Sequence, residues 1–411
     1  MDEQISSVRH RTVKLLTLCS LLFAANNAMA AFVDSVGGTA IVSDATAAYY
    51  NPAALTLIHK NQLVLLGIYQ NVYSHFTGTA SETITGVGTF TQSGSTSSAT
   101  NYYIPDSFLA IPVTQNVTLG FGEIYTFYGA SEYPYNSILR YFGTTSYISV
   151  LDFIPSIGVR VNDKLALGGG LDFDVAKTTL NFVFGFPGVI ADTQIVNKAT
   201  AAGVGGHVGI LIQPKLGTTI GLTYHSVASL NFTGHSTKES ATPLSTNLFK
   251  VSIPAVPSTE FSVDQFVNRK LGFIGTVKYT QWNRVKTLNL QNVVITSATP
   301  PTPSTVAQYH LRNTWRFTLG THYTVNPKWS LRAAVTYDQD PVNSRYQLAT
   351  GTNYLLGLSA AYHFTPDVIF DLSYGHVWYK GSNINITGSN TITGSTRGHR
   401  DGVVGKLTWN L

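Results

Sequence analysis

The chain has 411 residues and a formal net charge of +5, and only 11% of its residues are charged, against the ~25% usual in soluble domains. Its single cysteine, Cys19, excludes a disulfide framework and a metal site built from several thiolates. Beyond residue 30 no apolar run approaches the ~18 residues of a membrane-spanning helix, so helical membrane proteins are excluded as well.

Residues 1–30 have the pattern of a secretory signal peptide. Three basic residues precede an apolar run over residues 15–25, and an Ala-x-Ala cleavage pattern ends at Ala30. The run is shorter than the ~20 residues of a spanning helix, which disfavours an N-terminal membrane anchor. We expect export, with Cys19 removed alongside the signal. Because part of the positive charge lies in this segment, the net charge does not indicate a nucleic-acid partner.

Residues 31–60 do not follow the pattern of a strand. They are small and rich in glycine and alanine, and they end in the run NPAAL at residues 51–55. Asn-Pro is a turn signal, because proline pushes the residue before it out of the helical region. From the residue pattern alone, this segment would be a loop.

From residue 61 onward, apolar and polar residues alternate in segments of about ten residues, the length of a transmembrane β-strand. For example, Trp315 and Phe317 fall on one face of a strand, opposite Arg316 and Thr318. About fourteen such segments are found, an even number as in single-chain bacterial barrels. The segments are 61–73, 102–114, 116–129, 147–162, 164–180, 200–213, 217–231, 247–262, 270–289, 310–325, 328–339, 352–365, 367–380 and 400–411.

The connections between these segments alternate between tight and long. Tight turns are expected at 114–116 and 326–328, whereas 71–100, 290–309 and 381–399 are expected to be long loops. A transmembrane barrel has short periplasmic turns and long extracellular loops. A soluble antiparallel sandwich with one wet face has no reason to sort its loops in this way. We therefore predict an all-β fold, a transmembrane antiparallel β-barrel of about 14 strands in the bacterial outer membrane.

Three blocks of sequence resemble the FadL/TodX family of outer-membrane transporters for long-chain fatty acids and other hydrophobic compounds. The run from Asp44 to Leu55 resembles the family's N-terminal hatch and its Asn-Pro-Ala motif. Residues 271–290 resemble a strand that ends in Tyr-Thr-x-Trp, and residues 315–341 resemble paired late strands that end in Tyr-Asp-x-x-Pro. The resemblance covers nearly the whole chain after the signal, although the loops do not match residue by residue.

The resemblance implies a domain organisation and a transport route. Residues 31–60 would form a hatch inside the lumen of a barrel built from residues 61–411. Transport would be passive, with capture at extracellular loops, a lumen pocket gated by the hatch, and sideways release into the bilayer. Phe32 would insert into the pocket, although a disordered terminus is the alternative. The gating residues implied are Phe32, Asn51, Pro52 and Ala53.

The expected loop at residues 181–190 is unusually apolar for a segment in water, and an exposed apolar patch marks an interaction site. The resemblance implies a ligand groove between this loop and residues 232–248. The alternative is that the loops pack on each other as a lid. The residues expected in the groove are Phe182, Phe184, Phe186, Val189, Ile190, Leu244 and Leu248.

A fatty acid carries a carboxylate, which needs a partner when it is buried. Inward-facing cations are candidates, and arginine can bind a carboxylate through two hydrogen bonds. The alternative is that these cations pair with inward-facing carboxylates. The candidate cations are Arg160, Lys278, Arg316 and Arg332, and the competing carboxylates are Asp172, Asp174, Asp338 and Asp371.

Sideways release, as the resemblance implies it, requires a bend in the third strand. Gly120 and Gly122 flank Phe121 in that strand, and glycine within a strand often marks a bulge or bend. The alternative is that both are ordinary glycines on the inner face of the barrel.

Other functions find less support in the sequence. The chain has no G-x-S-x-G, no H-E-x-x-H and no phosphate-binding glycine motif, so we expect no catalysis, no cofactor and no metal. A lipase-like barrel enzyme is the runner-up class and would need a Ser/His/acid set, but His225, His322 and His363 are better explained as hydrogen-bonded lumen residues. A general porin would need no hatch. The sequence leaves open whether the ligand is a fatty acid or a monoaromatic hydrocarbon. We expect a monomer whose partners are hydrophobic small molecules and outer-membrane lipid.

Overall fold

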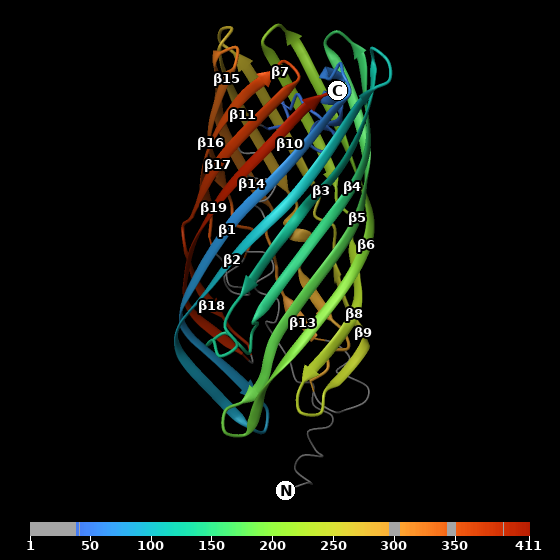
Figure 1. The fold of residues 1–411 in the computed structure, drawn as a ribbon. Helices are drawn as coiled ribbons and strands as arrows, with labels where there is room; N and C mark the ends of the chain where they lie inside the picture. Colours follow the sequence, from blue (N-terminus) through green and yellow to red (C-terminus); the bar gives the residue numbers. More distant parts are fainter. Residues whose placement is uncertain (1–37, 41, 296–304, 343–350, 389) are drawn as a thin grey trace.

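The computed structural model describes residues 38–40, 42–295, 305–342, 351–388 and 390–411. Within these residues 14 antiparallel strands close into one barrel, because β1 pairs with β2 on one side and with β19 on the other (Figure 1). This confirms the predicted fold class. The barrel strands are β1 (Gln62–Ile84), β2 (Gly88–Pro112), β3 (Val117–Glu132), β4 (Thr145–Asn162), β5 (Leu165–Phe186), β6 (Ile190–Lys215), β7 (Thr218–Ser226), β10 (Ser258–Phe266), β11 (Leu271–Thr280), β14 (Thr314–Asn326), β15 (Trp329–Asp338), β16 (Asn353–Thr365), β17 (Val368–Tyr379) and β19 (Thr391–Asn410).

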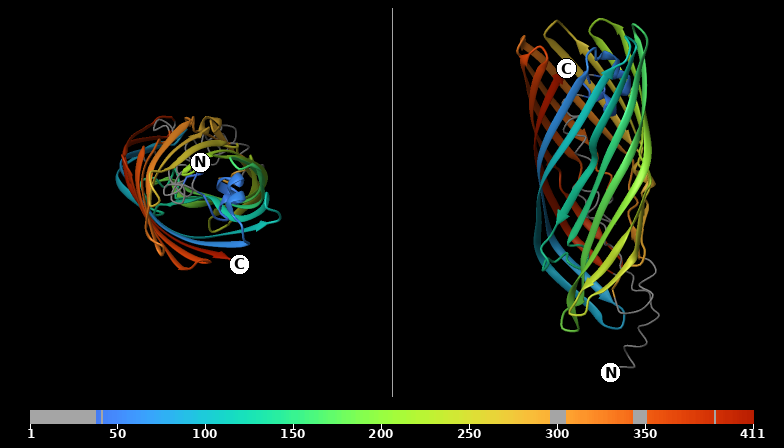
Figure 2. Two further views of the ribbon diagram at one scale, coloured as in Figure 1. Left: turned by 90° about the horizontal axis from the view of Figure 1, so that it is seen from above. Right: turned by 45° about the vertical axis from the view of Figure 1, so that its right-hand side comes forward.

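A short segment of the chain lies inside this ring. Helix α3 (Ala47–Tyr50) and the 3-10 helix η3 (Pro52–Leu57) sit within the barrel near the end that carries the tight turns (Figure 2). No helix in the described part of the chain is long and apolar enough to cross a membrane. Residues 1–30 and Phe32 lie outside the described residues. The division into signal, hatch and barrel therefore stays a prediction.

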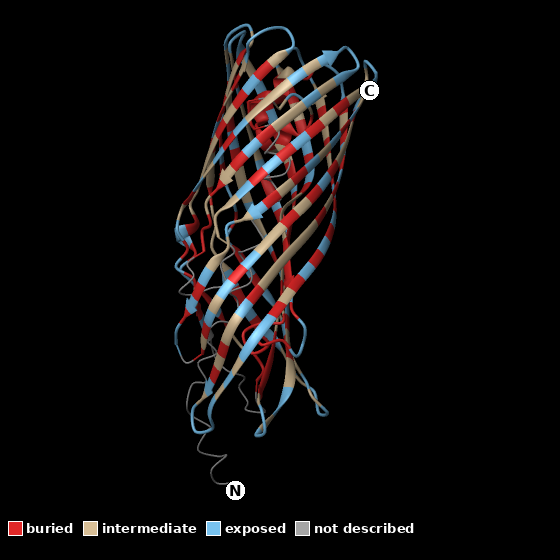
Figure 3. Ribbon diagram, turned by 90° about the vertical axis from the view of Figure 1, so that its left-hand side faces the viewer, coloured by how far each residue is buried: buried red, intermediate tan, exposed pale blue. Residues whose placement is uncertain are grey.

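Side chains alternate between the two faces of the wall, as buried and exposed bands along each strand show (Figure 3). In β14, Phe317 and Leu319 are 44% and 68% exposed, whereas Thr318 between them is 5% exposed. The outer face is apolar although it is exposed, which is the arrangement expected when that face meets lipid rather than water.

Two of the three predicted long loops, 71–100 and 381–399, are mostly strand, whereas much of 290–309 lies outside the described residues. At 71–100, β1 and β2 continue as one hairpin and leave only residues 85–87 as the turn. This ribbon is rich in Ser and Thr, and its outward hydroxyls pair across the strands, for example Thr79 with Ser93 at 2.8 Å and Thr83 with Thr89 at 2.9 Å. Such β-branched pairs stabilise a solvated hairpin. Residues 381–399 likewise contain β18 (Ser382–Ile386) and the start of β19.

The predicted strands at 217–231 and 247–262 are each split in two. After β7 the chain makes the hairpin of β8 (Leu230–Glu239) and β9 (Leu244–Ile253), which pairs with β6 beyond the end of β7. The barrel continues directly from β7 to β10. Pro254 and Pro257 separate β9 from β10, because proline cannot donate to a strand ladder. The predicted strand 270–289 also ends early, at Thr280. It is followed by η4 (Trp282–Arg284) and β12 (Thr287–Leu290), which pairs with β13 (Thr305–Gln308).

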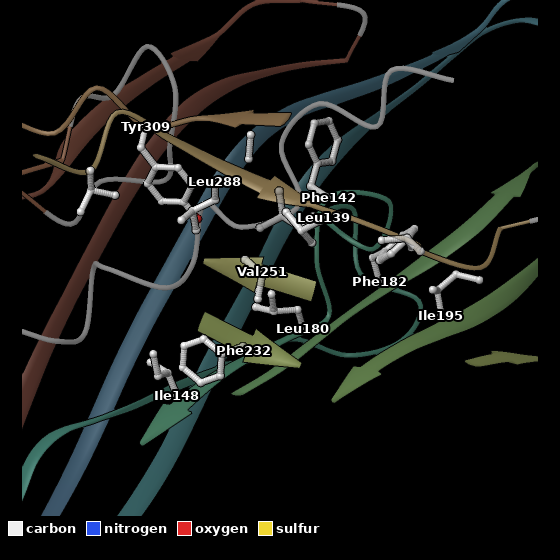
Figure 4. Packing of buried hydrophobic residues seen from close by; sticks show 14 of the residues in the cluster. Leu139, Phe142, Ile148, Leu180, Phe182, Ile195, Phe232, Val251, Leu288 and Tyr309 are labelled. Carbon is white, nitrogen blue, oxygen red and sulfur yellow. The ribbon is translucent and has the colours of Figure 1, made fainter. Parts of the chain in front are cut away.

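Buried apolar side chains form two clusters inside the barrel. One surrounds α3 and η3, with Ala53 and Leu55 fully buried. The other fills the opposite, extracellular end (Figure 4). It includes Leu139, Phe142, Ile148, Leu180, Phe182, Ile195, Phe232, Val251, Leu288 and Tyr309. Packed apolar side chains thus lie toward both ends of the barrel interior.

Candidate functional site

Polar contacts tie the segment 42–57 to the barrel wall. The Asp44 carboxylate lies 2.7 Å from the ammonium of Lys406 on β19. On the other side, the guanidinium of Arg160 on β4 donates to the Thr56 carbonyl. A charged partner at one end of the segment and a charge-assisted hydrogen bond at the other fix its position inside the ring.

Asn51 joins the turn before η3 to the wall. Its side chain is buried, and Nδ2 donates to the Ile210 carbonyl of β6 at 3.3 Å and to the Thr39 carbonyl at 3.4 Å. Its Oδ1 accepts from the Ala53 amide at 3.2 Å, which caps η3. Pro52 suits the first helical position because that position needs no N–H donor. Asn51, Pro52 and Ala53 thus form one turn against β6, and their gating role stays a prediction.

We call residues 42–57 the inner segment. Replacing Asn51 with alanine is expected to loosen the inner segment without unfolding the barrel. The change removes both donors to Thr39 and Ile210 and the cap of η3, at ~1–3 kcal/mol for buried groups left without partners. The barrel closes through its own backbone. Planar-bilayer conductance should rise while heat-resistant mobility on gels is unchanged. Thr56→Val is the control, because Thr56 Oγ1 bonds only within the segment, to Ala53. Equal conductance in Asn51→Ala and Thr56→Val would show that the bond between Asn51 and the barrel wall does not hold the inner segment in place.

A row of glycines makes room for this segment. Gly158, Gly168 and Gly209 are direct cross-strand partners on β4, β5 and β6. A methyl group added to Gly168 would lie 2.3 Å from the Pro52 carbonyl carbon, and one on Gly209 would lie 2.1 Å from Asn51 Oδ1. The inner segment packs backbone against backbone at this row, which only glycine allows. These glycines were not among the residues predicted for the site.

A buried histidine network lies beside the glycine row. His207 Nδ1 is 2.7 Å from the Asp172 carboxylate, and its Nε2 is 2.8 Å from the Ala48 carbonyl and 3.3 Å from Ser156 Oγ. The order Ser-His-Asp is that of a hydrolase triad. Here, however, both ring nitrogens face acceptors and Ser156 itself donates to Ala48. The imidazole therefore acts as a donor that holds α3, rather than as a base for Ser156.

His225 completes the group, with its ring 5.2 Å from that of His207 and stacked on it. Asp172, His207 and His225 offer ligand atoms within 4.8 Å of one another, as a metal site would. Asp172 and Ala48 already engage both nitrogens of His207. These contacts explain the cluster as a structural link between the barrel wall and the inner segment.

Three of the four cations predicted for a ligand carboxylate are paired with lumen carboxylates, and the fourth, Arg160, holds Thr56. Asp172 instead contacts His207, and Asp174 lies opposite Asp152 in the β4–β5 register. Ion pairing therefore describes these three cations, but the pairs join nearby strands along the wall rather than opposite sides of the lumen, and only Asp338 and Asp371 of the predicted carboxylates take part. The pairs are Lys278 with Glu260 at 3.7 Å, Arg316 with Asp338 at 3.0 Å and Arg332 with Asp371 at 3.7 Å.

Arg400 is a lumen cation that the sequence analysis missed. It is 1% exposed, and its guanidinium donates to the Tyr379 hydroxyl and lies 5.9 Å from the centroid of that ring. In register it stands between Val72 of β1 and Val377 of β17. The predicted last strand began at residue 400, so Arg400 was not assigned a face. Arg400 and the inward-facing Lys406 are an even number of residues apart, so both lie on the same face of the strand. This spacing could have identified Arg400 as a lumen residue.

Backbone pairing stops part of the way along the described strands β2 and β3. The β2–β3 ladder runs from Pro112 and Thr118 only to Ser107 and Glu123, although β2 and β3 both continue beyond it. There, β3 pairs with β4 alone, and its register shifts at Thr126, an extra residue between Tyr125 and Phe127. A bulge of this kind bends the strand. We call the unpaired stretch of β2 and β3 the wall gap.

Side chains of β2 take the place of the missing ladder. Asp106 Oδ1 accepts from the Tyr125 amide at 3.0 Å. The Tyr102 hydroxyl donates to the Ala130 carbonyl at 2.6 Å and accepts from the Ala130 amide at 2.8 Å. Because these are inward-facing side chains of β2, β3 has moved toward the lumen. The wall gap is thus closed by hydrogen bonds from side chains, which can break without disrupting a backbone ladder.

The two glycines predicted to mark the bend lie just before it. Gly120 faces the inner segment, where an added methyl group would lie 2.8 Å from Leu55. Gly122 lies under Phe108 on the last paired stretch, one residue before Glu123. Both are close-approach positions on the inner face, and the bulge at Thr126 supplies the bend itself.

The prediction of a loop at 181–190 was wrong, because β5 runs to Phe186 and β6 begins at Ile190. Phe182 and Phe184 are buried in the extracellular cluster, whereas Val189 and Leu248 are 66% and 54% exposed. Apolar side chains inside a closing hairpin pack rather than face water, which the isolated sequence could not reveal. Phe186, Ile190 and Leu244 are half-buried.

The connection 133–144 between β3 and β4 folds into the extracellular mouth. Arg140 bonds the Asp192 carboxylate of β6 at 2.8 Å, and the Tyr141 hydroxyl bonds the same carboxylate at 2.7 Å. Burial raises the pKa of Glu82 nearby to about 8, with the Asp192 charge adding to this rise and Arg140 opposing it. The mouth is therefore covered by an apolar lid with few free charges.

A closed barrel with an internal segment, a lumen cation and a gap in its wall defines the class of outer-membrane transport proteins. Residues 24–408 match the family described as outer membrane protein transport protein (OMPP1/FadL/TodX), and the chain belongs to this family. The family consists of transporters and channels rather than enzymes. The chain is thus an outer-membrane protein of a family that transports hydrophobic compounds.

Relatives and solved structures agree with this assignment. The chain is 26% identical over 407 residues to outer membrane protein P1 of Haemophilus influenzae, covering 87% of this chain and 84% of the relative. It is 21% identical over 401 residues to the long-chain fatty acid transport protein of Escherichia coli, covering 85% of each. A FadL homologue of Pseudomonas aeruginosa has the same fold, with a TM-score of 0.82, 18% identity and coverage of 95% of this chain and 100% of that one. The toluene transporter TodX of Pseudomonas putida has a TM-score of 0.70 and 14% identity, with coverage of 92% of this chain and 98% of that one.

Proposed function

We propose that this chain is a passive transporter that carries long-chain fatty acids across the outer membrane and releases them sideways into the bilayer. The observation that carries this proposal is the wall gap, where the β2–β3 ladder ends at Ser107 and Glu123. The substrate class is supported by the relative from Escherichia coli, which is named a long-chain fatty acid transport protein.

Physical chemistry favours a sideways exit for such a ligand. Expulsion into the aqueous periplasm would cost ~0.8 kcal/mol for each CH₂ exposed to water. The axial path is also occupied by the segment 42–57, which is held by Lys406 and Arg160. To open the wall gap, only the hydrogen bonds of Asp106 and Tyr102 to β3 need to break. Direct passage into lipid then keeps the chain of the ligand buried throughout.

The lumen beside the wall gap suits a carboxylate attached to an apolar chain. Arg400 lies beside Val72, Val377 and Tyr379. Val72 in turn lies opposite Thr100 of β2, whose hydroxyl is 2.8 Å from the Tyr102 hydroxyl at the wall gap. A guanidinium in apolar surroundings binds a carboxylate through charge-assisted hydrogen bonds. We therefore place the ligand headgroup at Arg400 rather than at the four cations predicted from the sequence.

Monoaromatic hydrocarbons are the second candidate ligand. Four tyrosines on β2, β3 and β4 line the wall gap edge to face, with ring centroids 5.3–5.6 Å apart. Aromatic rings favour such edge-to-face partners. These residues are Tyr102, Tyr125, Tyr128 and Tyr147.

Replacing Arg400 with glutamine is expected to weaken fatty-acid binding about tenfold, the value of one lost charge-assisted hydrogen bond. Toluene binding should be unchanged, because it needs no cation. Equilibrium binding of labelled oleate and of toluene to the purified protein measures both. Lys278→Gln is the matched control, because that cation already lies 3.7 Å from Glu260. Unchanged oleate binding in Arg400→Gln, or an equal loss in both variants, would place the headgroup elsewhere.

The remaining steps of the route complete the proposal. Capture takes place at the exposed rim formed by Val189 and Leu248, and Phe182 and Phe184 support it as part of the lid. The segment 31–60 acts as a hatch, and Phe32 occupies the lumen until ligand displaces it. Residues 1–30 are removed on export. We expect a monomer, because each barrel strand is paired on both sides apart from the wall gap.

A further inference from the structure

Outside the barrel, three histidines and an arginine gather on one face. They lie on β17, β19 and β1, three neighbouring strands that run side by side across the wall (Figure 1). Cross-strand register places Trp378 beside His399 and His399 beside Tyr73, with Arg397 opposite His75 in the next position. We call this set the outer patch. Its members are Tyr374, His376, Trp378, Arg397, His399, Asp401, Tyr73 and His75.

The outer patch lies at the level of lipid headgroups. Its Trp378 is opposite Tyr354 on β16, and Tyr354 stacks near Tyr337 with centroids 5.6 Å apart, so the row continues a girdle of aromatic side chains. Toward the tight-turn end, the same face carries exposed apolar residues such as Leu372 and Val403. The apolar band of a barrel ends at its aromatic girdles. The outer patch is therefore at the boundary between hydrocarbon and the extracellular side.

Arg397 is the permanent cation of the outer patch. The one carboxylate of the patch, Asp401, is engaged by His376 Nδ1 at 2.7 Å and by the Tyr374 hydroxyl at 2.6 Å. Among the described residues, Arg397 has no side-chain hydrogen bond or ion pair, and His399 makes only ring contacts, such as that with Tyr73 at 5.2 Å. An exposed guanidinium is thus available next to aromatic rings.

We propose that the outer patch binds the phosphorylated headgroup of a lipid in the outer leaflet. Arg397 offers a guanidinium fork to phosphate oxygens, and His399 supplies a further ring N–H donor, whereas both ring nitrogens of His75 are engaged by Ser97 and Thr77. Trp378 and Tyr374 suit the boundary between headgroup and acyl chains. The acyl chains would lie on the apolar wall below, at Leu372 and Val403. A soluble anion has no such second contact, so the site selects a lipid.

The double variant Arg397→Gln/His399→Gln tests this proposal. The probes are phosphatidic acid and phosphatidylcholine with identical chains, added to the full-length protein in neutral-detergent micelles and counted by native mass spectrometry. The double variant should bind phosphatidic acid about tenfold more weakly than the wild type, since a charge-assisted contact is lost. Phosphatidylcholine binding should not change, because its phosphate is already paired with its own ammonium group.

Lys177→Gln is the matched control, an exposed outward cation on β5 above Phe173 and Val175 that lacks neighbouring imidazoles. It should leave binding of phosphatidic acid unchanged. Wild-type affinity in the double variant, or an equal loss in Lys177→Gln, would overturn the proposal. So would displacement of phosphatidic acid by an equal concentration of inorganic phosphate, which would indicate a simple anion site. Heat-resistant gel mobility confirms folding, and the single variant Arg397→Gln serves if the double variant fails to fold.

Discussion

Deletion of Thr126 is expected to stop fatty-acid delivery while leaving binding intact. Thr126 is the extra residue of the β3 bulge, because Tyr125 and Phe127 face the adjacent residues Leu151 and Val150 on β4. Without it, β3 regains a regular register and can continue its ladder with β2 past Glu123. A continuous ladder closes the wall gap. Uptake of labelled oleate by cells should fall by about tenfold or more, whereas binding to the purified protein should change little, as expected when only an exit step is blocked.

Thr126→Ala is the matched control for the deletion. It shortens the side chain but keeps the extra residue and hence the bulge. Uptake in this variant should stay near the wild-type value. Hydrogen exchange at the amides of β3 beyond Tyr125 reports whether the ladder has extended in the deletion variant, because the Tyr125 amide is already bonded to Asp106. Wild-type uptake together with newly protected amides in that stretch would show that ligand leaves by another path.

Replacing Gly168 with alanine is expected to displace the inner segment. The new methyl group would lie 2.3 Å from the backbone of Pro52 and Ala53, a separation that neither the strand nor η3 can accommodate without moving. The strand is held by two ladders, whereas η3 is held by a few side chains, so η3 should move. Planar-bilayer conductance should rise by about tenfold or more, because water then reaches the plugged lumen. Heat-resistant mobility should be kept.

Gly169→Ala provides a neighbouring control on the same strand. Its methyl group would point outward, 3.4 Å from the nearest atom, the His207 carbonyl oxygen. Both substitutions lower the backbone freedom of β5 equally, so they differ only in the face that receives the methyl group. Conductance in Gly169→Ala should match the wild type. A closed channel in both variants would mean that the inner segment adapts and that the glycine row is not needed for its seating.

The sequence was sufficient for the architecture because the barrel repeats one simple rule. Alternation along β14 and the tight turns followed directly from residue patterns, and both are present in the structure. The extracellular half was harder to predict. Its Ser- and Thr-rich ribbons in β1 and β2 lack the apolar alternation of the lipid-facing wall, so they read as loops.

The candidate site was only partly predictable because it depends on register. Alternation gives the face of Arg316 or Arg332 but not its neighbour across the sheet, and each proved to be paired with an aspartate. The bulge at Thr126 and the glycine row at Gly168 likewise exist only once neighbouring strands are aligned. Arg400 was within reach of the pattern, but the predicted strand boundary fell on it. Features that arise from contacts between distant segments therefore required the structure.

Where the ligand emerges from the barrel tests the account most directly. A fatty acid with a photoreactive group at the end of its chain can be bound to the protein in liposomes, activated by light, and located by peptide mapping. Sideways release predicts label on the outward-facing residues beside the wall gap, such as Tyr103 of β2 and Phe121 of β3, which are 75% and 47% exposed. Deletion of Thr126 should remove this label. Label concentrated on residues 42–60 at the tight-turn end, and unchanged by the deletion, would show axial release and contradict the proposed route.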